Sequence, residues 1–316
     1  MDKIINTFTS TGAKIMHHSA VIRKLQMLYA TPVSLQVAPT SKCNLNCVFC
    51  SNVNRGRDED LDVDMLKDII LKLFYYGLKT VEWTGGGEPT LWHSIEEMIA
   101  WTASLTSCHK IKQGLITNGL ELAKISKKNL DTFKWIRISM NCLDYVDAIE
   151  VPKIQGTLGF SYVMNEKSDS KVMLRLFDFV ERHKPAYVRI VPNCQATDVE
   201  QEHNNRELSE LVKLWGPPYF YQAKIFQKPD KCYWGYLKPF INFDGSVFRC
   251  SSVVLNPDSG CRFHEKYKWC NIEDLVSKYK EKIIPYNPTD CYHCVFKNQN
   301  DLIDSIINPN GHEDFI

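Results

Sequence analysis

Three cysteines near the start of the chain, Cys43, Cys47 and Cys50, form a C-x3-C-x2-C motif. Because the start of the sequence does not resemble a secretory signal, we expect thiols at this spacing to serve metal binding or catalysis rather than disulfides. A [4Fe-4S] cluster has four irons, so three cysteines leave one iron open to another ligand. A structural zinc site needs four protein ligands, and nothing beside this segment supplies the fourth. The spacing favours an iron–sulfur cluster, with a zinc site or a chance grouping of cysteines as the alternatives.

The motif has an aromatic residue, Phe49, directly before its third cysteine. In this it resembles the radical S-adenosylmethionine (SAM) superfamily. The resemblance implies that SAM binds the open iron and that the reduced cluster cleaves SAM to methionine and a 5′-deoxyadenosyl radical, which takes hydrogen from a substrate. It also implies an external one-electron reductant of the flavodoxin or ferredoxin type.

A glycine-rich segment, Thr84-Gly85-Gly86-Gly87-Glu88-Pro89, follows the second expected strand. Glycines let the backbone approach a ligand closely, and a carboxylate accepts hydrogen bonds from an ammonium group. The alternative is an ordinary glycine-rich turn. The segment resembles the GGEP motif of the same family, which implies that Gly86, Gly87 and Glu88 contact the methionine end of SAM.

Weaker similarities to the family occur at later strand ends. The resemblance implies that Ser139 and Asn141 contact the ribose and carboxylate of SAM, that Asn165 does the same, and that Val191 packs on the adenine. Because strand ends are commonly polar, ordinary loop residues explain these positions equally well.

A second group of cysteines lies in the last third of the chain: Cys232, Cys250, Cys291 and Cys294. Four thiolates suit structural zinc and a fully ligated iron–sulfur cluster equally well. Their layout, C-x12-G-x4-C followed by C-x2-C, resembles the auxiliary-cluster extension called SPASM in its shortened twitch form. The layout also resembles that of 2-deoxy-scyllo-inosamine dehydrogenase, and it implies one auxiliary [4Fe-4S] cluster. Cys261 and Cys270 lie between these cysteines and could replace one of the four.

Other side chains on or just after the expected strands could have either a structural or a functional role. Cys142 and Cys194 follow the fourth and sixth expected strands, and such cysteines are usually small buried apolar groups. At these positions either could instead donate a hydrogen atom or a proton to a substrate intermediate. Arg189 could hold an anionic substrate or form a structural ion pair. The aromatic runs at residues 219–221 and 233–234 are expected to pack over the second cluster rather than to form a base-stacking platform.

The elements that must position these residues alternate between residues 33 and 216. Short β-branched or aromatic runs alternate with segments of helical period, the pattern of parallel βα units. The expected strands are 33–37, 80–83, 114–117, 135–140, 159–164 and 187–191. The expected helices are 63–76, 94–105, 121–128, 145–150, 171–183 and 200–215. The pattern predicts an α/β fold, a partial (β/α)6 barrel, with the motifs at the C-terminal ends of its strands.

The chain is expected to divide into an N-terminal extension (1–32), the barrel (33–216), a twitch domain built from a β-hairpin plus a helix (217–307) and a tail (308–316). Asp244-Gly245, between two short apolar runs, predicts the hairpin. No apolar run approaches the roughly 18 residues that span a bilayer. We expect a cytoplasmic protein that does not contact the membrane.

The charge balance limits the kinds of partner. The chain has 38 Lys and Arg against 37 Asp and Glu, which predicts no strong attraction to nucleic acid, although a local basic groove would suffice for binding. The expected substrate is small and polar or of nucleoside type, and it is oxidised or rearranged. An amino-acid-decorated thymidine in phage DNA, modified by isomerisation, is one alternative, and a peptide is another. The short N-terminal extension disfavours a peptide. A noncatalytic iron–sulfur or zinc protein explains the cysteines but not the glycine–glutamate motif.

Overall fold

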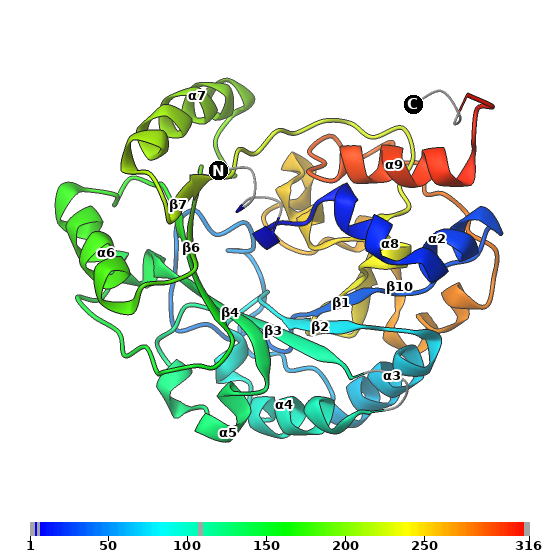
Figure 1. The fold of residues 1–316 in the computed structure, drawn as a ribbon, viewed down its shortest axis with the longest axis horizontal. Helices are drawn as coiled ribbons and strands as arrows, with labels where there is room; N and C mark the ends of the chain where they lie inside the picture. Colours follow the sequence, from blue (N-terminus) through cyan, green and yellow to red (C-terminus); the bar gives the residue numbers. More distant parts are fainter. Residues whose placement is uncertain (1–3, 5–6, 107–109, 313–316) are drawn as a thin grey trace.

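The computed structural model describes residue 4, residues 7–106 and residues 110–312 of the chain. One ten-stranded sheet forms its centre, in the order β10-β9-β8-β1-β2-β3-β4-β5-β6-β7. The strands are β1 (Ser34–Val37), β2 (Thr80–Trp83), β3 (Lys112–Thr117), β4 (Phe133–Ser139), β5 (Thr157–Val163), β6 (Tyr187–Val191), β7 (Tyr219–Tyr221), β8 (Phe240–Ile241), β9 (Ser246–Phe248) and β10 (Lys268–Asn271). The sheet curves into an open barrel (Figure 1).

The first six strands pair in parallel in chain order, which confirms the predicted partial barrel. A seventh strand, β7, adds in parallel to β6 beyond the expected barrel boundary at residue 216. The prediction that residues 219–221 pack over the second cluster was therefore wrong. Tyr219 lies edge-on to Phe177 and Trp215, and the Tyr221 hydroxyl donates to Asn205.

Helices line the outer side of the barrel (Figure 1). They are α3 (Val63–Tyr76), α4 (Ile95–Ser104), α5 (Lys127–Leu130), α6 (Ser170–His183) and α7 (Asp198–Trp215). In α3 the Asp62 carboxylate accepts a hydrogen bond from the Met65 backbone at the start, and Gly77 ends the helix with a φ of 111°. The buried stripe of α3 packs on the sheet: Leu66, Ile69, Ile70, Leu73 and Phe74. The helix expected at 121–128 is two short pieces, a 3-10 turn (Leu122–Lys124) and α5.

The helix expected at 145–150 is absent from the described structure. A 3-10 turn (Met140–Asp144) follows β4, and the chain then runs without regular structure to β5. The Asn141 side chain binds both the backbone N–H and the carbonyl of Val163, which ties this turn to the end of β5. Polar side chains that bind the backbone in this way compete with helix formation.

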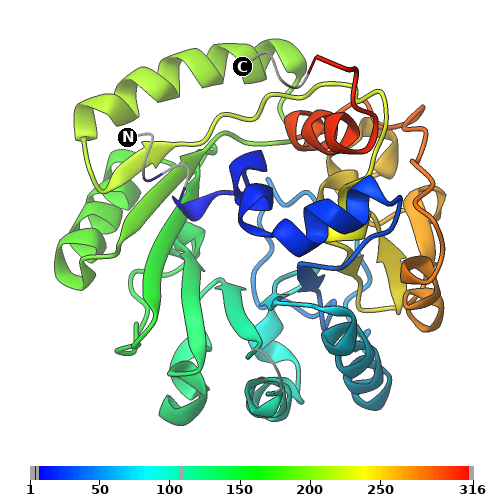
Figure 2. The same cartoon turned by 45° about the vertical axis from the view of Figure 1, so that its right-hand side comes forward.

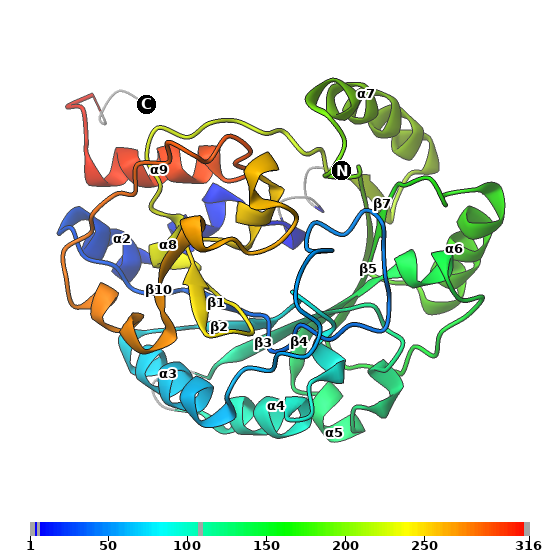
Figure 3. The same cartoon turned by 180° about the vertical axis from the view of Figure 1, so that it is seen from behind.

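The predicted hairpin is confirmed. β8 and β9 pair antiparallel around Gly245, whose φ is 78°, and β10 adds to β9. β8 also pairs in parallel with β1, so the C-terminal segment continues the barrel sheet (Figure 3). A short helix, α8 (Trp234–Leu237), precedes the hairpin.

The two ends of the described chain meet. A 3-10 turn (Gly12–His17) and α2 (Ser19–Gln26) lie beside the last helix, α9 (Lys297–Ile307) (Figure 2). The Gln299 amide donates to the Ser10 carbonyl at 2.9 Å. No helix in the described parts of the chain combines the length and the apolar character that crossing a membrane requires.

Candidate functional site

The three N-terminal cysteines lie on the loop between β1 and α3, on the barrel face seen in Figure 3. All three are half-buried free thiols. Burial raises the pKa of Cys47 to about 11, and the nearby Cys50 and Cys43 act in the same direction. The Cys47 thiol is therefore protonated near neutrality and would release its proton on binding iron. Arg55 lies beside them, its Nη1 3.7 Å from the Cys50 sulfur.

The glycine-rich segment packs directly against this cysteine loop. The Gly87 N–H donates to the Thr40 carbonyl at 2.9 Å, and the Glu88 N–H donates to the Lys42 carbonyl at 2.7 Å. A Cβ at Gly87 would lie 2.1 Å from the Lys42 oxygen, and one at Gly86 would lie 2.5 Å from the ring of Phe243. Glycine is required because the two backbones touch. The residues expected to hold the methionine end of SAM thus lie beside the residues expected to hold the cluster.

The Glu88 side chain is buried and has several protein partners. One oxygen accepts hydrogen bonds from the hydroxyls of Thr117 (2.6 Å) and Thr90 (2.7 Å), and the other accepts from the Asn118 N–H (2.7 Å). Burial raises the pKa of Glu88, and these hydrogen bonds oppose the rise. Asn118 in turn donates to the Asn44 side chain on the cysteine loop. Glu88 therefore joins the ends of β2 and β3 to that loop.

The amides of Asn141 and Asn165 are also held by protein groups. Both donate to one oxygen of Asp144 at 3.0 Å and to the Val163 carbonyl at 2.9 Å. The other Asp144 oxygen accepts from the Tyr162 hydroxyl. The two asparagines expected to contact SAM are thus brought together at the ends of β4 and β5. Ser139 ends β4, Val191 ends β6, and Phe49 is half-buried on the cysteine loop.

The two cysteines proposed as hydrogen donors have different surroundings. Cys142 is fully buried in the hydrophobic core, and burial raises its pKa to about 12. Cys194 is half-buried after β6, 3.8 Å from the Pro192 carbonyl. Neither lines the barrel cavity described below.

The second group of cysteines shares one small cavity: Cys232, Cys250, Cys291 and Cys294. Burial raises the pKa of Cys291 to about 12 and that of Cys294 to about 11, and the neighbouring thiols add to both shifts. Cys261 and Cys270 do not line this cavity. Within the described residues, no three His, Cys, Asp or Glu side chains form a group that could hold a single metal ion. Four free thiols around one cavity suit a larger cluster, which spaces its ligands further apart than an ion does.

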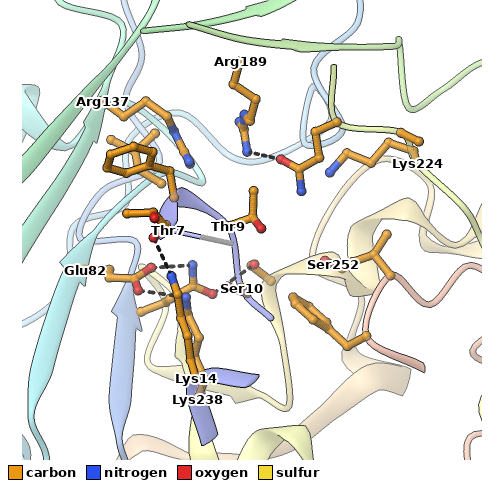
Figure 4. A pocket seen from close by; sticks show the side chains of 18 of the residues that line it. Thr7, Thr9, Ser10, Lys14, Glu82, Arg137, Arg189, Lys224, Lys238 and Ser252 are labelled. Atoms are coloured by element: carbon orange, nitrogen blue, oxygen red, sulfur yellow. Dashed lines mark hydrogen bonds and ion pairs between the residues drawn. The ribbon is translucent and has the colours of Figure 1, made fainter. Parts of the chain in front are cut away.

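A cavity of about 790 Å³ occupies the interior of the barrel (Figure 4). Its walls come from the six strands β1 to β6, from the segment after β7, from Lys238 and residues 251–252, and from residues 7–10 and 294–298 near the chain ends. Cys294 and Ser252 line both this cavity and the small cysteine cavity. The two cavities are therefore adjacent, and the Cys294 thiol lies between them. The volume is within the usual range of small-molecule sites.

Sequence reasoning named only Arg189 among the charged residues of this cavity. It missed Glu82 and Lys238, which form a partly buried ion pair at 2.8 Å, and also Arg137 and Lys224. A charged residue alternating with apolar ones on β2 and β4 was the available signal, because alternate residues of a barrel strand face the interior. Lys238 and Lys224 lie outside the predicted strands and carried no such signal.

Comparison with known proteins agrees with this geometry. Residues 37–152 match the radical SAM superfamily. A segment is 30% identical over 138 residues to GTP 3′,8-cyclase of Corynebacterium glutamicum, covering 39% of this chain and 36% of that protein. Another is 28% identical over 117 residues to a probable GTP 3′,8-cyclase of Methanococcus maripaludis, covering 36% of this chain and 38% of that protein. The matches thus span little more than a third of these relatives.

Two solved structures share the fold over most of the chain. Streptococcus suis SuiB bound to its precursor peptide SuiA has a TM-score of 0.57 at 15% identity, covering 87% of this chain and 71% of SuiB. anSMEcpe with bound AdoMet and a peptide has a TM-score of 0.54 at 14% identity, covering 87% of this chain and 84% of that one. Residues 37–152, which hold the cysteine loop and the glycine–glutamate segment, thus form a domain that matches the radical SAM superfamily.

Proposed function

We propose that this protein oxidises a small polar or nucleoside-type substrate in the barrel cavity, by SAM-dependent radical chemistry. Cys43, Cys47 and Cys50 would hold the SAM-binding [4Fe-4S] cluster, and Gly86, Gly87 and Glu88 would form the site for the methionine end of SAM. When bound, the cluster and SAM would supply a 5′-deoxyadenosyl radical able to remove a hydrogen atom from the substrate.

The observation that carries oxidation is the position of Cys294. Its side chain lines both the cysteine cavity and the barrel cavity. An auxiliary [4Fe-4S] cluster on Cys232, Cys250, Cys291 and Cys294 would supply a one-electron acceptor beside the substrate. In an oxidation the substrate loses a hydrogen atom and then an electron and a proton. A rearrangement needs no such acceptor, so the shared thiol favours oxidation.

The protein itself would exclude water and orient the substrate. Residues 7–10 and the start of α9 close one side of the cavity, and polar side chains such as Gln36 and Gln222 face into it. The relatives named GTP 3′,8-cyclase support a nucleoside-type substrate, because their name specifies a nucleotide. The matches cover only 36–38% of these relatives, so their reaction is not carried over to this chain.

The test is anaerobic reconstitution with iron and sulfide, followed by dithionite and SAM, with 5′-deoxyadenosine measured by mass spectrometry. We expect 5′-deoxyadenosine from the wild-type protein and none from a Cys43→Ala, Cys47→Ala, Cys50→Ala variant. Cys261→Ala is the matched control, since Cys261 lies outside both cysteine groups, and it should retain the product. Intact iron clusters without 5′-deoxyadenosine above background would sink the proposal.

Deuterated candidate substrates separate oxidation from rearrangement. Deuterium should pass into 5′-deoxyadenosine, and the product of oxidation should be lighter than the substrate by two hydrogens. A product of unchanged mass would establish rearrangement and overturn the assignment of oxidation.

A further inference from the structure

The barrel cavity is strongly cationic. Its charged lining consists of one acidic and seven basic residues: Glu82, Lys14, Lys134, Arg137, Arg189, Lys224, Lys238 and Lys297. Glu82 pairs with Lys238, and Lys297 pairs with Asp301. Among the residues that the structure describes, Arg137, Arg189 and Lys224 have no carboxylate within ion-pair distance. Figure 4 shows these three side chains converging from separate elements toward the centre of the cavity.

The two arginines carry unused hydrogen-bond donors. Within the described part of the chain, the Nε atoms of Arg137 and Arg189 are buried without a partner, and the one side-chain acceptor of Arg189 is the neutral Gln222, at 3.1 Å. Burial and the charge of Arg137 together lower the pKa of Arg189 to about 9, so Arg189 still carries its charge near neutrality. Burial also lowers the pKa of Lys224, an effect that the nearby Cys194 opposes. Buried, unpaired like charges are costly unless a counter-charge joins them.

The arginines also have a fixed relation to the expected SAM site. Arg137 lies two residues before Ser139 on β4, and Arg189 lies two residues before Val191 on β6. Residues i and i+2 of a strand face the same side, roughly 7 Å apart along it. The unpaired cations therefore form a layer of the barrel interior next to the layer expected to contact SAM.

We propose that Arg137, Arg189 and Lys224 bind a phosphoryl group, so that the substrate is a phosphorylated small molecule. Three positive charges exceed what one carboxylate neutralises and match a phosphate monoester or a diphosphate. The planar fork of an arginine also suits phosphate oxygens. A phosphoryl group held here directs the rest of the substrate toward the SAM layer. The inference rests on the proposed function in treating this cavity as the substrate site, but anion binding is measured without turnover.

The experiment is anaerobic calorimetry on the reconstituted holoenzyme with inorganic pyrophosphate, inorganic phosphate and citrate as separate probes. We expect pyrophosphate to bind and citrate to bind at least about tenfold more weakly. Arg189→Gln should weaken pyrophosphate binding by at least about tenfold, and Arg189→Lys, which keeps the charge but not the fork, should fall between Arg189→Gln and wild type. Arg182→Gln is the matched control, because Arg182 is exposed on α6 and pairs with Asp178.

Folding is checked by the thermal transition without ligand, which Arg189→Gln should leave unchanged or raise, because a buried unpaired charge is removed. Equal binding of citrate and pyrophosphate, no pyrophosphate binding, or equal losses in Arg189→Gln and Arg182→Gln would each overturn the phosphoryl assignment. The same preparations are assayed for 5′-deoxyadenosine. If 5′-deoxyadenosine forms but pyrophosphate does not bind, only the phosphoryl inference is refuted. If pyrophosphate binds but no 5′-deoxyadenosine forms, only the proposed function is refuted.

Discussion

The Thr117 hydroxyl donates a 2.6 Å hydrogen bond to the buried carboxylate of Glu88. Thr117 is the last residue of β3, and Glu88 belongs to the segment after β2, so this bond joins neighbouring strand ends. The adjacent Asn118 N–H reaches the second oxygen of the same carboxylate. Glu88 thus stabilises the contact between the segment after β2 and the end of β3.

Thr117→Val removes this donor at nearly constant volume. We expect a loss of about 1–3 kcal/mol in the free energy of unfolding, because a buried carboxylate oxygen loses a partner. SAM affinity, measured by equilibrium dialysis of the reconstituted protein, should also fall. Thr90→Val is the control: Thr90 donates to the same oxygen from the 3-10 turn that directly follows Glu88, and it does not join the strands. If both variants weaken SAM binding equally, the hydrogen bond between the two strand ends does not determine SAM affinity.

Gly87→Ala should disrupt the contact between the glycine-rich segment and the cysteine loop. The added Cβ would lie 2.1 Å from the Lys42 carbonyl oxygen, and a backbone neighbour cannot move aside cheaply. We expect destabilisation above about 3 kcal/mol in urea unfolding, or failure to fold. Gly260→Ala places the methyl group in open space at a φ of 64° and should cost only about 1–2 kcal/mol. Wild-type stability of Gly87→Ala would contradict the backbone arrangement described here.

Cys294→Ser should remove the auxiliary cluster and spare the SAM cluster. Iron should fall from roughly eight to roughly four atoms per chain, because each [4Fe-4S] cluster contributes four. SAM cleavage without substrate should persist. Cys270→Ser should keep the full iron content, since Cys270 does not line the cysteine cavity. Loss of iron in Cys270→Ser and not in Cys294→Ser would reassign the ligand.

The Glu82–Lys238 pair predicts a pH-dependent stability. Burial acts to raise the pKa of Glu82, but the charge and hydrogen bond of Lys238 outweigh it and hold this pKa below its usual value. Ionised Glu82 therefore stabilises the fold above about pH 4.5, and this contribution is lost as the pH falls through the lowered folded-state pKa.

Glu82→Gln should lower the free energy of unfolding by about 3 kcal/mol at pH 7, because it leaves Lys238 unpaired. The difference from wild type should shrink as the pH falls below about 4.5. The double variant Glu82→Gln, Lys238→Met should recover much of the loss. Urea unfolding at a series of pH values measures all three proteins, and a difference that stays constant with pH would refute the pairing.

The sequence predicted the parts of the fold that local patterns determine. All six barrel strands and the helices at 63–76 and 171–183 follow from hydrophobic period and from end signals such as Asp62 and Gly77. The helix expected at 145–150 failed because the Asn141 and Asp144 side chains bind residues some twenty positions away. β7 was missed because its three aromatic residues carry no period.

For the candidate site too, the sequence predicted the residues that belong to local motifs but not the contacts between distant residues. The resemblance of their layout to the twitch extension picked out the four cysteines that share one cavity, although it left Cys261 and Cys270 as possible replacements. No pattern could place Lys224 beside Arg137 and Arg189, because they are brought together only when the sheet curves. The hydrogen bonds of the Asn141, Asn165 and Glu88 side chains could not be predicted from the sequence either, because each partner lies on another strand end or loop.

The meeting of the two chain ends has a consequence for folding order. Residues 7–10 form part of the cavity wall, and Gln299 on α9 holds the Ser10 carbonyl. During synthesis the barrel strands emerge long before α9, so the cavity acquires its last wall only when the C-terminal helix leaves the ribosome. Loading of cofactors into the barrel can therefore precede closure of the chamber, and a nascent chain lacking α9 would be open to solvent on that side.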